Sequence, residues 1–234
     1  MSPSTTTKAP ARTARTQLSR EVVADRAVTL ADSEGLEAVT IRRLATELGV
    51  TPMALYWHFR TKEDLLAGLG DRVLDAVQVP ARTGEWDVDL RAGLVALLDA
   101  MRPHPELAPL VVGRVMDHPT GLVLTELALA ALSDAGLPPE PASWFAVQAL
   151  RTVTALVTGD PVVDAEKSAP DREAHQRQKL ARIAALSPAD FPALHAHADA
   201  LSACSDVDLF IEVGLDHYVE GVRGVASRRG GATG

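Results

Sequence analysis

Residues 40–66 read TIRRLATELGVTPMALYWHFRTKEDLL, and three threonines in this stretch are placed to begin helices. Thr40, Thr51 and Thr61 each precede a helix-forming run, and threonine is a preferred residue for capping a helix N-terminus. Gly49 predicts the end of the first of these helices, because glycine readily adopts the left-handed conformation found there. The segment therefore predicts two helices joined by a four-residue turn, GVTP, and a further helix after Thr61.

Another helix precedes this segment. Ser19 can cap it and Gly35 predicts its end. We expect the helix after Thr51 to run to about Phe59 and the helix after Thr61 to about Gln78. Helical periodicity then predicts a common core, to which we assign Val23, Ala27, Ala31, Ile41, Leu44 and Leu48.

The helix after Thr51 carries neighbouring aromatic residues that cannot all be buried. Successive residues of a helix point about 100° apart, so Trp57 points outward when Leu55 and Phe59 face the core. An exposed tryptophan usually has a partner. The major groove of DNA offers thymine methyls for apolar contact and phosphates for hydrogen bonds. The candidates are Met53, Ala54 and Trp57 for the methyl groups, and Tyr56 and His58 for the phosphates.

Three cations lie close to this helix in the sequence. Arg42 and Arg43 point about 130° away from the buried face of their own helix, where guanidinium groups could reach base edges or phosphates. Lys62, in the first turn of the next helix, adds positive charge beside backbone N–H groups. The alternative is that the aromatic residues pack on another domain and that the arginines are simply solvated.

Charge is unevenly distributed along the 234 residues. Residues 1–62 hold nine Lys and Arg against six Asp and Glu, whereas the remainder holds fourteen against twenty-five. This contrast indicates an anion-binding module joined to an acidic regulatory or assembly domain. Cys204 is the only cysteine, which excludes an intrachain disulfide. No apolar run is long enough to span a bilayer.

The rest of the chain predicts helices, because no convincing run of strand alternation occurs. The chain is therefore all-α, with helices expected near 87–101, 107–117, 120–135, 140–158, 171–186, 189–203 and 206–227. Residues 140–158 and 206–227 are apolar nearly all round, so they need cover on every side. A second copy of the chain could supply it, with Gly214, Gly221 and Gly224 allowing close approach; a monomeric bundle with these helices at its centre is the alternative.

Taken together, these residues resemble the DNA-binding signature of the TetR family of bacterial transcriptional regulators, over roughly residues 18–66. The resemblance implies base reading around Arg42, Pro52, Met53 and Ala54, and backbone anchoring by Thr40, Thr51, Tyr56, Trp57, His58 and Lys62. Where many relatives carry Gln, Thr or Ser for base reading, this chain has Pro52, Met53 and Ala54. Hydrogen-bonded readout therefore falls mainly to Arg42.

The body more weakly resembles a tetracycline-repressor-like C-terminal domain, which implies a two-fold dimer and a small molecule held inside. Arg114 stands where the tetracycline repressor carries a magnesium-binding His, and His118 comes four residues later. We therefore expect no metal and no cofactor. Candidate pocket-wall residues, each of which core packing could also explain, are Leu107, Leu110, Met116, Leu122, Trp144 and Phe145.

The sequence shows no Gly-rich phosphate loop, zinc-type Cys/His spacing or nucleophile motif, which argues against an enzyme. A DNA-bound adaptor whose body binds a protein remains an alternative. We expect a cytoplasmic, homodimeric repressor that a small apolar effector releases from inverted-repeat DNA. The expected divisions are a disordered arm (1–17, where Arg12 and Arg15 could touch DNA), a helix-turn-helix domain (18–66), a connecting helix (67–80), a ligand-binding and dimerisation domain (81–227) and a disordered tail (228–234).

Overall fold

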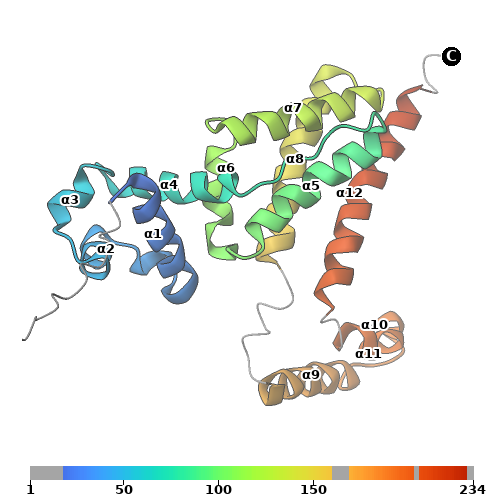
Figure 1. Ribbon diagram of the computed structural model, residues 1–234. Coiled ribbons are helices and arrows are strands. Elements are labelled where there is room, and N and C mark those ends of the chain that lie inside the picture. Colours follow the sequence, from blue (N-terminus) through green and yellow to red (C-terminus); the bar gives the residue numbers. More distant parts are fainter. Residues whose placement is uncertain (1–17, 160–168, 203–205, 231–234) are drawn as a thin grey trace, which may run out of the picture.

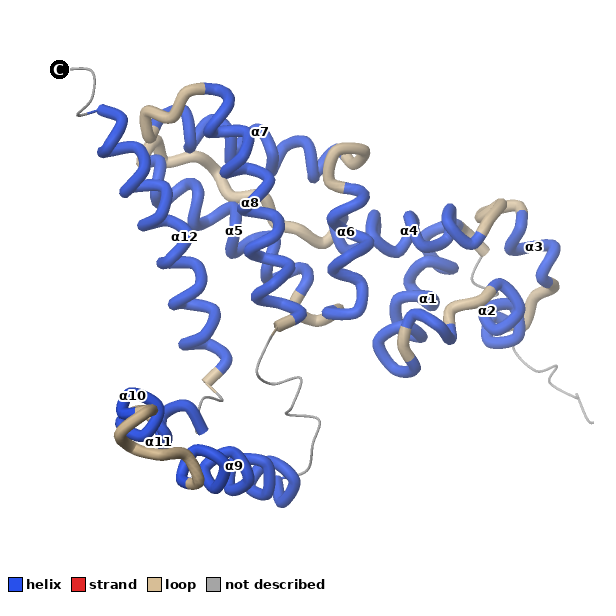
Figure 2. Tube along the Cα trace, turned by 180° about the vertical axis from the view of Figure 1, so that it is seen from behind, coloured by secondary structure: helices blue, strands red, loops and turns tan. Residues whose placement is uncertain are grey.

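The computed structural model describes residues 18–159, 169–202 and 206–230. Within these ranges every regular element is a helix, and Figure 2 shows helices and loops without a strand. Helices α1 to α4 form one end of the molecule, and α4 leads from them into the body (Figure 1). The all-α prediction, with a small N-terminal unit and a larger helical body, is confirmed.

The N-terminal unit consists of α1 (Arg20–Glu34), a 3-10 turn (Leu36–Ala38), α2 (Ile41–Leu48), α3 (Pro52–Tyr56) and α4 (Lys62–Asp75). All four predicted caps are present: the side chains of Ser19, Thr40, Thr51 and Thr61 each accept a hydrogen bond from the backbone N–H three residues later. Gly49 has φ 64°, the left-handed conformation that turns the chain between α2 and α3.

Two boundaries and two core positions differ from the prediction. Helix α3 ends at Tyr56 and α4 at Asp75, each three residues earlier than expected. Ile41 and Leu48 are half-buried rather than buried, while Ala45 is buried beside Leu44. The reason is the shortness of α2, whose end residues lie at the edge of this small core.

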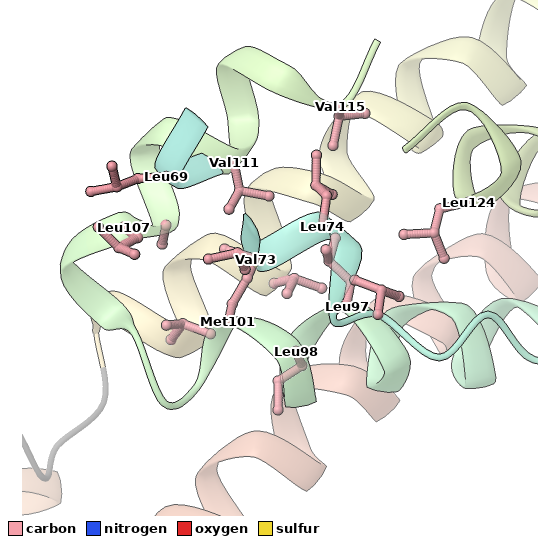
Figure 3. Packing of buried hydrophobic residues seen from close by; sticks show 14 of the residues in the cluster. Leu69, Val73, Leu74, Leu97, Leu98, Met101, Leu107, Val111, Val115 and Leu124 are labelled. Carbon is pink, nitrogen blue, oxygen red and sulfur yellow. The ribbon is translucent and has the colours of Figure 1, made fainter. Parts of the chain in front are cut away.

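Helix α4 joins the unit to the body through apolar packing. Leu69, Val73 and Leu74 are almost fully buried, and Figure 3 shows them beside Leu107 and Val111 of the body. A side chain at Gly70 would collide with the body, because a Cβ there would lie 3.0 Å from the Leu110 carbonyl oxygen. The connecting helix and the body are therefore closely packed along this contact.

The body is built from α5 (Trp86–Met101), a 3-10 turn (Pro105–Leu107), α6 (Ala108–Arg114), α7 (Pro119–Asp134), α8 (Pro139–Thr158) and α12 (Val207–Gly230). Helix α12 packs on α8, where the Tyr218 hydroxyl donates to the Phe145 carbonyl oxygen at 2.5 Å. Gly214 allows close approach within the chain, since a Cβ there would lie 2.4 Å from Leu156. Our assignment of Gly214 to an intermolecular contact was therefore wrong.

Helices α9 (Ala169–Ala184), α10 (Pro192–Ala196) and α11 (Ala198–Ser202) lie apart from α5–α8, near the start of α12 (Figures 1 and 2). Two short helices thus replace the single one expected at 189–203, because the chain breaks at His197. Helix α12 continues to Gly230, so the predicted disordered tail begins too early. The predictions for 1–17, Cys204 and 231–234 lie outside the described residues.

The segment 80–86, predicted as a joint between domains, is held by a buried carboxylate. Asp89 is 1% exposed and accepts hydrogen bonds from Thr83 N and Thr83 Oγ1, both at 2.7 Å, and from Gly84 N at 3.1 Å. The Thr83 bonds are the main cause that lowers the pKa of Asp89 to about 2. The joint is therefore an ordered connection.

Candidate DNA interface and effector cavity

Helix α3 and Trp57, the residue directly after it, present large apolar side chains to solvent. Trp57 is 85% exposed, Met53 68% and Tyr56 47%, whereas Leu55 and Phe59 are completely buried. This is the orientation that helical periodicity predicted. A contiguous exposed apolar surface of this kind is typical of a binding site.

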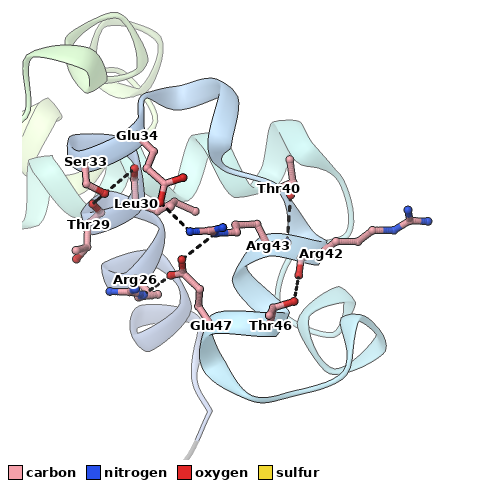
Figure 4. Close-up of polar contacts among 10 residues, drawn as sticks. All are labelled: Arg26, Thr29, Leu30, Ser33, Glu34, Thr40, Arg42, Arg43, Thr46 and Glu47. Atoms are coloured by element: carbon pink, nitrogen blue, oxygen red, sulfur yellow. Dashed lines mark hydrogen bonds and ion pairs between the residues drawn. The ribbon is translucent and has the colours of Figure 1, made fainter.

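The two adjacent arginines of α2 have different surroundings, as Figure 4 shows. Arg43 donates to Glu34 Oε1 at 2.7 Å and to Glu47 Oε1 at 2.9 Å. Arg26 of α1 also pairs with Glu47, so this network ties α1 to α2. The Arg42 side chain extends away from the network, and no carboxylate among the described residues pairs with it. Arg42 is thus available to a phosphate or a base, while Arg43 is engaged within its own domain.

A second network fixes the corner between α3 and α4. Arg20 donates to the His58 carbonyl oxygen at 2.6 Å and to Asp64 Oδ1 at 2.7 Å, and its guanidinium lies 4.2 Å from the centre of the Phe59 ring. Asp64 also accepts from Arg60 N. The hydrogen bond from Arg20 is the main cause that lowers the pKa of Asp64. Sequence reasoning missed this role of Arg20, because no local pattern links two residues so far apart in the chain.

The remaining predicted DNA contacts are exposed or half-buried residues of the same N-terminal unit. Thr40 and Thr51 are exposed, and because their hydroxyl oxygens accept the cap hydrogen bonds, each hydroxyl proton stays available to donate. Lys62 is exposed in the first turn of α4. Pro52 is exposed, while Ala54 and His58 are half-buried.

The body contains an apolar cavity of about 270 Å³ between α5, α7 and α8, closed at one side by the end of α6. Met116 and Val147 are exposed lining residues, so the cavity reaches the surface beside them. Thr125 and Ser143 are the polar side chains of the wall. The full lining consists of Leu90, Gly93, Leu94, Leu97, Val115, Met116, Leu124, Thr125, Leu127, Ala128, Leu129, Ser143, Ala146, Val147, Ala149 and Leu150.

Of the six residues predicted for the pocket wall, Met116 lines this cavity. Leu107 is fully buried against α4, and the backbone of Leu110 lies against Gly70 of α4. Both residues therefore belong to the contact between the domains. Leu122 is 47% exposed on α7, outside the lining. Trp144 and Phe145 border a different depression near the start of α8, together with Val225 and Arg229 of α12.

Helix α6 lies between the cavity and the DNA-binding unit. At its end, Val115 and Met116 line the cavity, while the preceding Arg114 donates from Nε to Asp71 Oδ1 of α4 at 2.8 Å. The start of α7 is fitted closely to this end, because a Cβ at Gly121 would lie 2.1 Å from the Val115 carbonyl oxygen. A shift of α6 would therefore displace its contacts with both α4 and α7.

Two histidines also join the body to the DNA-binding unit. His118 lies 3.3 Å from Asp75 of α4, and His104 lies 2.8 Å from Asp32 of α1. Neither pair has a third ligand: among the residues that the structure describes, no group of three His, Cys, Asp or Glu side chains is placed to hold a metal. Arg114, at the position compared with a magnesium ligand, is itself engaged by Asp71 and Asp117.

The outer faces of α8 and α12 expose apolar residues that lie apart from the recognition surface. Trp144 is 66% exposed, Leu209 55% and Val213 58%. A Cβ at Gly221 would meet nothing within 4 Å. These helices therefore leave an apolar face uncovered in the single chain, as expected for helices that pack on a second copy.

Both halves of the chain match models of known families. The model of bacterial regulatory proteins of the tetR family matches residues 23–69, and that of the tetracyclin repressor-like C-terminal domain matches residues 80–226. The chain belongs to the TetR family. As a member, it is a DNA-binding transcriptional regulator with a ligand-responsive body, and it acts as a homodimer.

Individual relatives agree with this assignment. An HTH-type transcriptional regulator of Saccharopolyspora erythraea is 31% identical over 188 residues, which cover 79% of this chain and 78% of the relative. The class A tetracycline repressor from transposon 1721 of Escherichia coli is 30% identical over 210 residues, covering 88% and 91%. The crystal structure of Streptomyces coelicolor ActR with actinorhodin has a TM-score of 0.75 at 27% identity, covering 88% of this chain and 96% of ActR.

The predicted family, fold and regulatory function of this TetR-family chain are thus confirmed, and the relatives above are regulators. In the described part of the chain, no helix has the length and apolarity required to cross a membrane.

Proposed function

We propose that this TetR-family regulator represses transcription from an inverted-repeat operator until a small, mainly apolar molecule enters the cavity of its body. The observation that carries the proposal is the position of α6, whose end lines the cavity while Arg114 and the Leu110 backbone contact α4. Ligand entry and the orientation of the DNA-binding unit thus depend on the same helix. We also propose that the protein acts in the bacterial cytoplasm and is not an enzyme.

The proposal assigns distinct roles within residues 18–66. Arg42 reads a base, and Pro52, Met53 and Ala54 make apolar contact with base edges. Arg43 holds α2 against α1 through Glu34 and Glu47. The residues that anchor the DNA backbone are Thr40, Thr51, Tyr56, Trp57, His58 and Lys62.

Residues 67–80 then transmit the signal, and 81–227 bind the effector and the second copy. In a dimer, two recognition helices spaced about 34–36 Å apart would reach successive major grooves. Release requires that the effector bind the DNA-incompetent arrangement more tightly, and a hundredfold preference corresponds to about 2.7 kcal/mol of coupling. By reciprocity, operator DNA must weaken effector binding by the same factor.

The cavity favours a small molecule over a protein as the partner of the body, because its lining is almost wholly apolar and enclosed by three helices. ActR, solved with actinorhodin and with (S)-DNPA, supports the same kind of ligand. The adaptor alternative would leave this cavity without a role.

The test begins by recovering the operator from genomic fragments with the purified protein. Small apolar molecules are then screened for release of that operator, and each active one is titrated calorimetrically with and without DNA. We expect weaker binding when the operator is present. Equal affinities would contradict the inducer role, and tighter binding with operator would identify a corepressor.

A pair of variants on α7 checks that the cavity is the responsive site. Ala128→Phe places a ring in the cavity and should abolish release while operator binding persists. Ala130→Phe, also half-buried on α7 but outside the lining, is the matched control and should respond normally. Normal release from Ala128→Phe would place the effector elsewhere.

A further inference from the structure

The wall of the effector cavity contains very little polarity. Thr125 of α7 and Ser143 of α8 carry its two polar side chains, and no charged side chain lines it. The other lining side chains are aliphatic, or the thioether of Met116. The chemistry of these two hydroxyl groups therefore determines which polar atoms a bound molecule can satisfy.

Both hydroxyl protons are already used. Thr125 Oγ1 donates to the Gly121 carbonyl oxygen at 2.8 Å, and Ser143 Oγ donates to the Pro139 carbonyl oxygen at 2.8 Å. A hydroxyl group has one proton and two lone pairs. What remains for a molecule in the cavity is therefore acceptor capacity. Met116 Sδ, 3.8 Å from Thr125 Oγ1, is a second and weaker acceptor on the same side.

A ligand acceptor such as an ether or ketone oxygen would be poorly matched to this wall. To receive a hydrogen bond from Thr125, it would have to displace the Gly121 carbonyl oxygen, leaving that oxygen without its additional donor. A ligand donor meets no such competition, because the oxygen lone pairs of Thr125 accept without any rearrangement.

A charged ligand would also be poorly matched to this uncharged lining. A carboxylate held inside the cavity, away from the opening beside Met116 and Val147, would lose its water without gaining a cation, and an ammonium group there would gain no carboxylate, because the lining holds neither. Burying an unpaired charge in apolar surroundings is strongly unfavourable. The volume of about 270 Å³ lies just below the range for ligand pockets, roughly 300–1,000 Å³, and suits a small molecule.

We propose that the cavity takes an uncharged, mainly apolar molecule bearing a hydroxyl or N–H donor, such as a phenol or an alcohol, and that Thr125 accepts that hydrogen bond. This inference rests on the proposed function, which makes the cavity the site where the effector binds. It adds the chemical class of the effector and names a specificity-determining residue.

The test uses the purified full-length protein without DNA and three probes that share one ring system: 2-naphthol, 2-methoxynaphthalene and 2-naphthoate. Isothermal titration at neutral pH compares a neutral donor, a neutral acceptor and an anion. We expect 2-naphthol to bind about tenfold more tightly than the methyl ether, the equivalent of one hydrogen bond, and 2-naphthoate to bind more weakly than either. Equal binding of naphthol and ether, tighter binding of the naphthoate, or no binding of any probe would overturn the proposal.

Variants locate the preference. Thr125→Val keeps the shape of the side chain but removes the acceptor, so the two neutral probes should bind it alike, and Thr125→Ser should recover the preference. Thr154→Val is the matched control, because Thr154 makes the same kind of bond to the Leu150 carbonyl oxygen at 2.9 Å but lies outside the lining. A preference that survives in Thr125→Val would refute the role of this residue.

Because no operator is present, these titrations are independent of repression. If the donor preference and its loss in Thr125→Val are found but no probe of this class releases the operator, the chemistry of the cavity stands and the inducer mechanism fails. If release is found with anionic or acceptor-only molecules bound in the cavity, the inducer mechanism stands and the donor class is wrong.

Discussion

Trp57, directly after α3, and Trp144 in α8 are both largely exposed, at 85% and 66%, yet their surroundings differ. The N-terminal unit that carries Trp57 also carries the exposed cations Arg42, in α2, and Lys62, in α4. Trp144 is on α8, whose partner α12 exposes acidic residues among its apolar ones, including Glu212. Exposed apolar area alone thus indicates a partner without identifying it.

The charge around each surface distinguishes the two partners. A DNA-binding surface needs cations to contact phosphates and apolar side chains to contact the thymine methyls of the major groove, and the N-terminal unit carries both. The phosphates of DNA would repel the acidic body, so DNA is not the partner of the apolar face on α8 and α12. A second copy of the chain suits this face, provided that uncharged side chains meet at the centre of the contact. The following predictions test this distinction, beginning with the largest expected effect.

Val213→Glu should separate the dimer. Val213 is 58% exposed on α12, and a carboxylate there would be buried twice in a two-fold interface without a cation. Breaking an interface with an unpaired buried charge costs about 3–5 kcal/mol. Sedimentation velocity should show a monomer at micromolar concentration, and affinity for the inverted repeat should fall by at least a hundredfold.

The matched control is Val123→Glu, a similarly exposed valine on α7 at 52%. It should remain dimeric and keep its operator affinity. A Val213→Glu protein that stays dimeric would show that the subunits meet through another face.

Arg42→Ala and Arg43→Ala should have different effects although the residues are neighbours. Loss of Arg42 should cost about 1–3 kcal/mol at the contacted base pair and flatten discrimination among operator variants. Loss of Arg43 should leave discrimination intact and lower stability slightly, because exposed ion pairs contribute about 0.2–1 kcal/mol each. Competition binding against single-base operator variants, with thermal melts of both proteins, measures these effects. Equal flattening by both variants would show that Arg43 also reads bases.

Lys62→Ala should weaken binding to all sequences alike. Removing one phosphate contact reduces the slope of log affinity against log salt by roughly one unit. Titrations at several salt concentrations, on operator and on unrelated DNA, provide the comparison. An unchanged slope would remove Lys62 from the DNA interface.

The smallest effect should come from the DNA itself. Replacing an operator thymine that faces Met53 or Trp57 by uracil deletes one methyl group and should cost about 0.8 kcal/mol. The same replacement at an uncontacted thymine is the control. If every replacement were silent, the apolar residues of α3 would not read methyl groups.

Local signals explain why the DNA-binding unit could be predicted so well. Four caps, the Gly49 turn and the outward direction of Trp57 each depend on a few neighbouring residues. The partners of Arg43 and Arg20 could not be predicted, because Glu34, Glu47 and Asp64 approach them only after the helices pack.

The cavity was the least predictable feature. Leu90, Leu94 and Leu97 follow the spacing of any core-facing helix, so nothing in the sequence separates a wall from filled core. Conversely, Leu107 and Trp144 looked equally suitable, yet one is buried against α4 and the other lies at the surface. The cavity exists because the side chains of α5, α7 and α8 do not fill the space between these helices. That gap can be recognised only in the packed structure.

The carboxylate of Asp89 has a consequence for regulation. Its folded pKa is about 2, below the ordinary 3.8, so its stabilising contribution is complete above pH 3.8 and is lost only as the pH falls toward 2. Above pH 3.8 the Asp89 carboxylate therefore stays ionised and keeps its hydrogen bonds to Thr83 and Gly84 of segment 80–86. Protonation of Asp89 is therefore not a route by which pH above this value could alter the connection between α4 and α5.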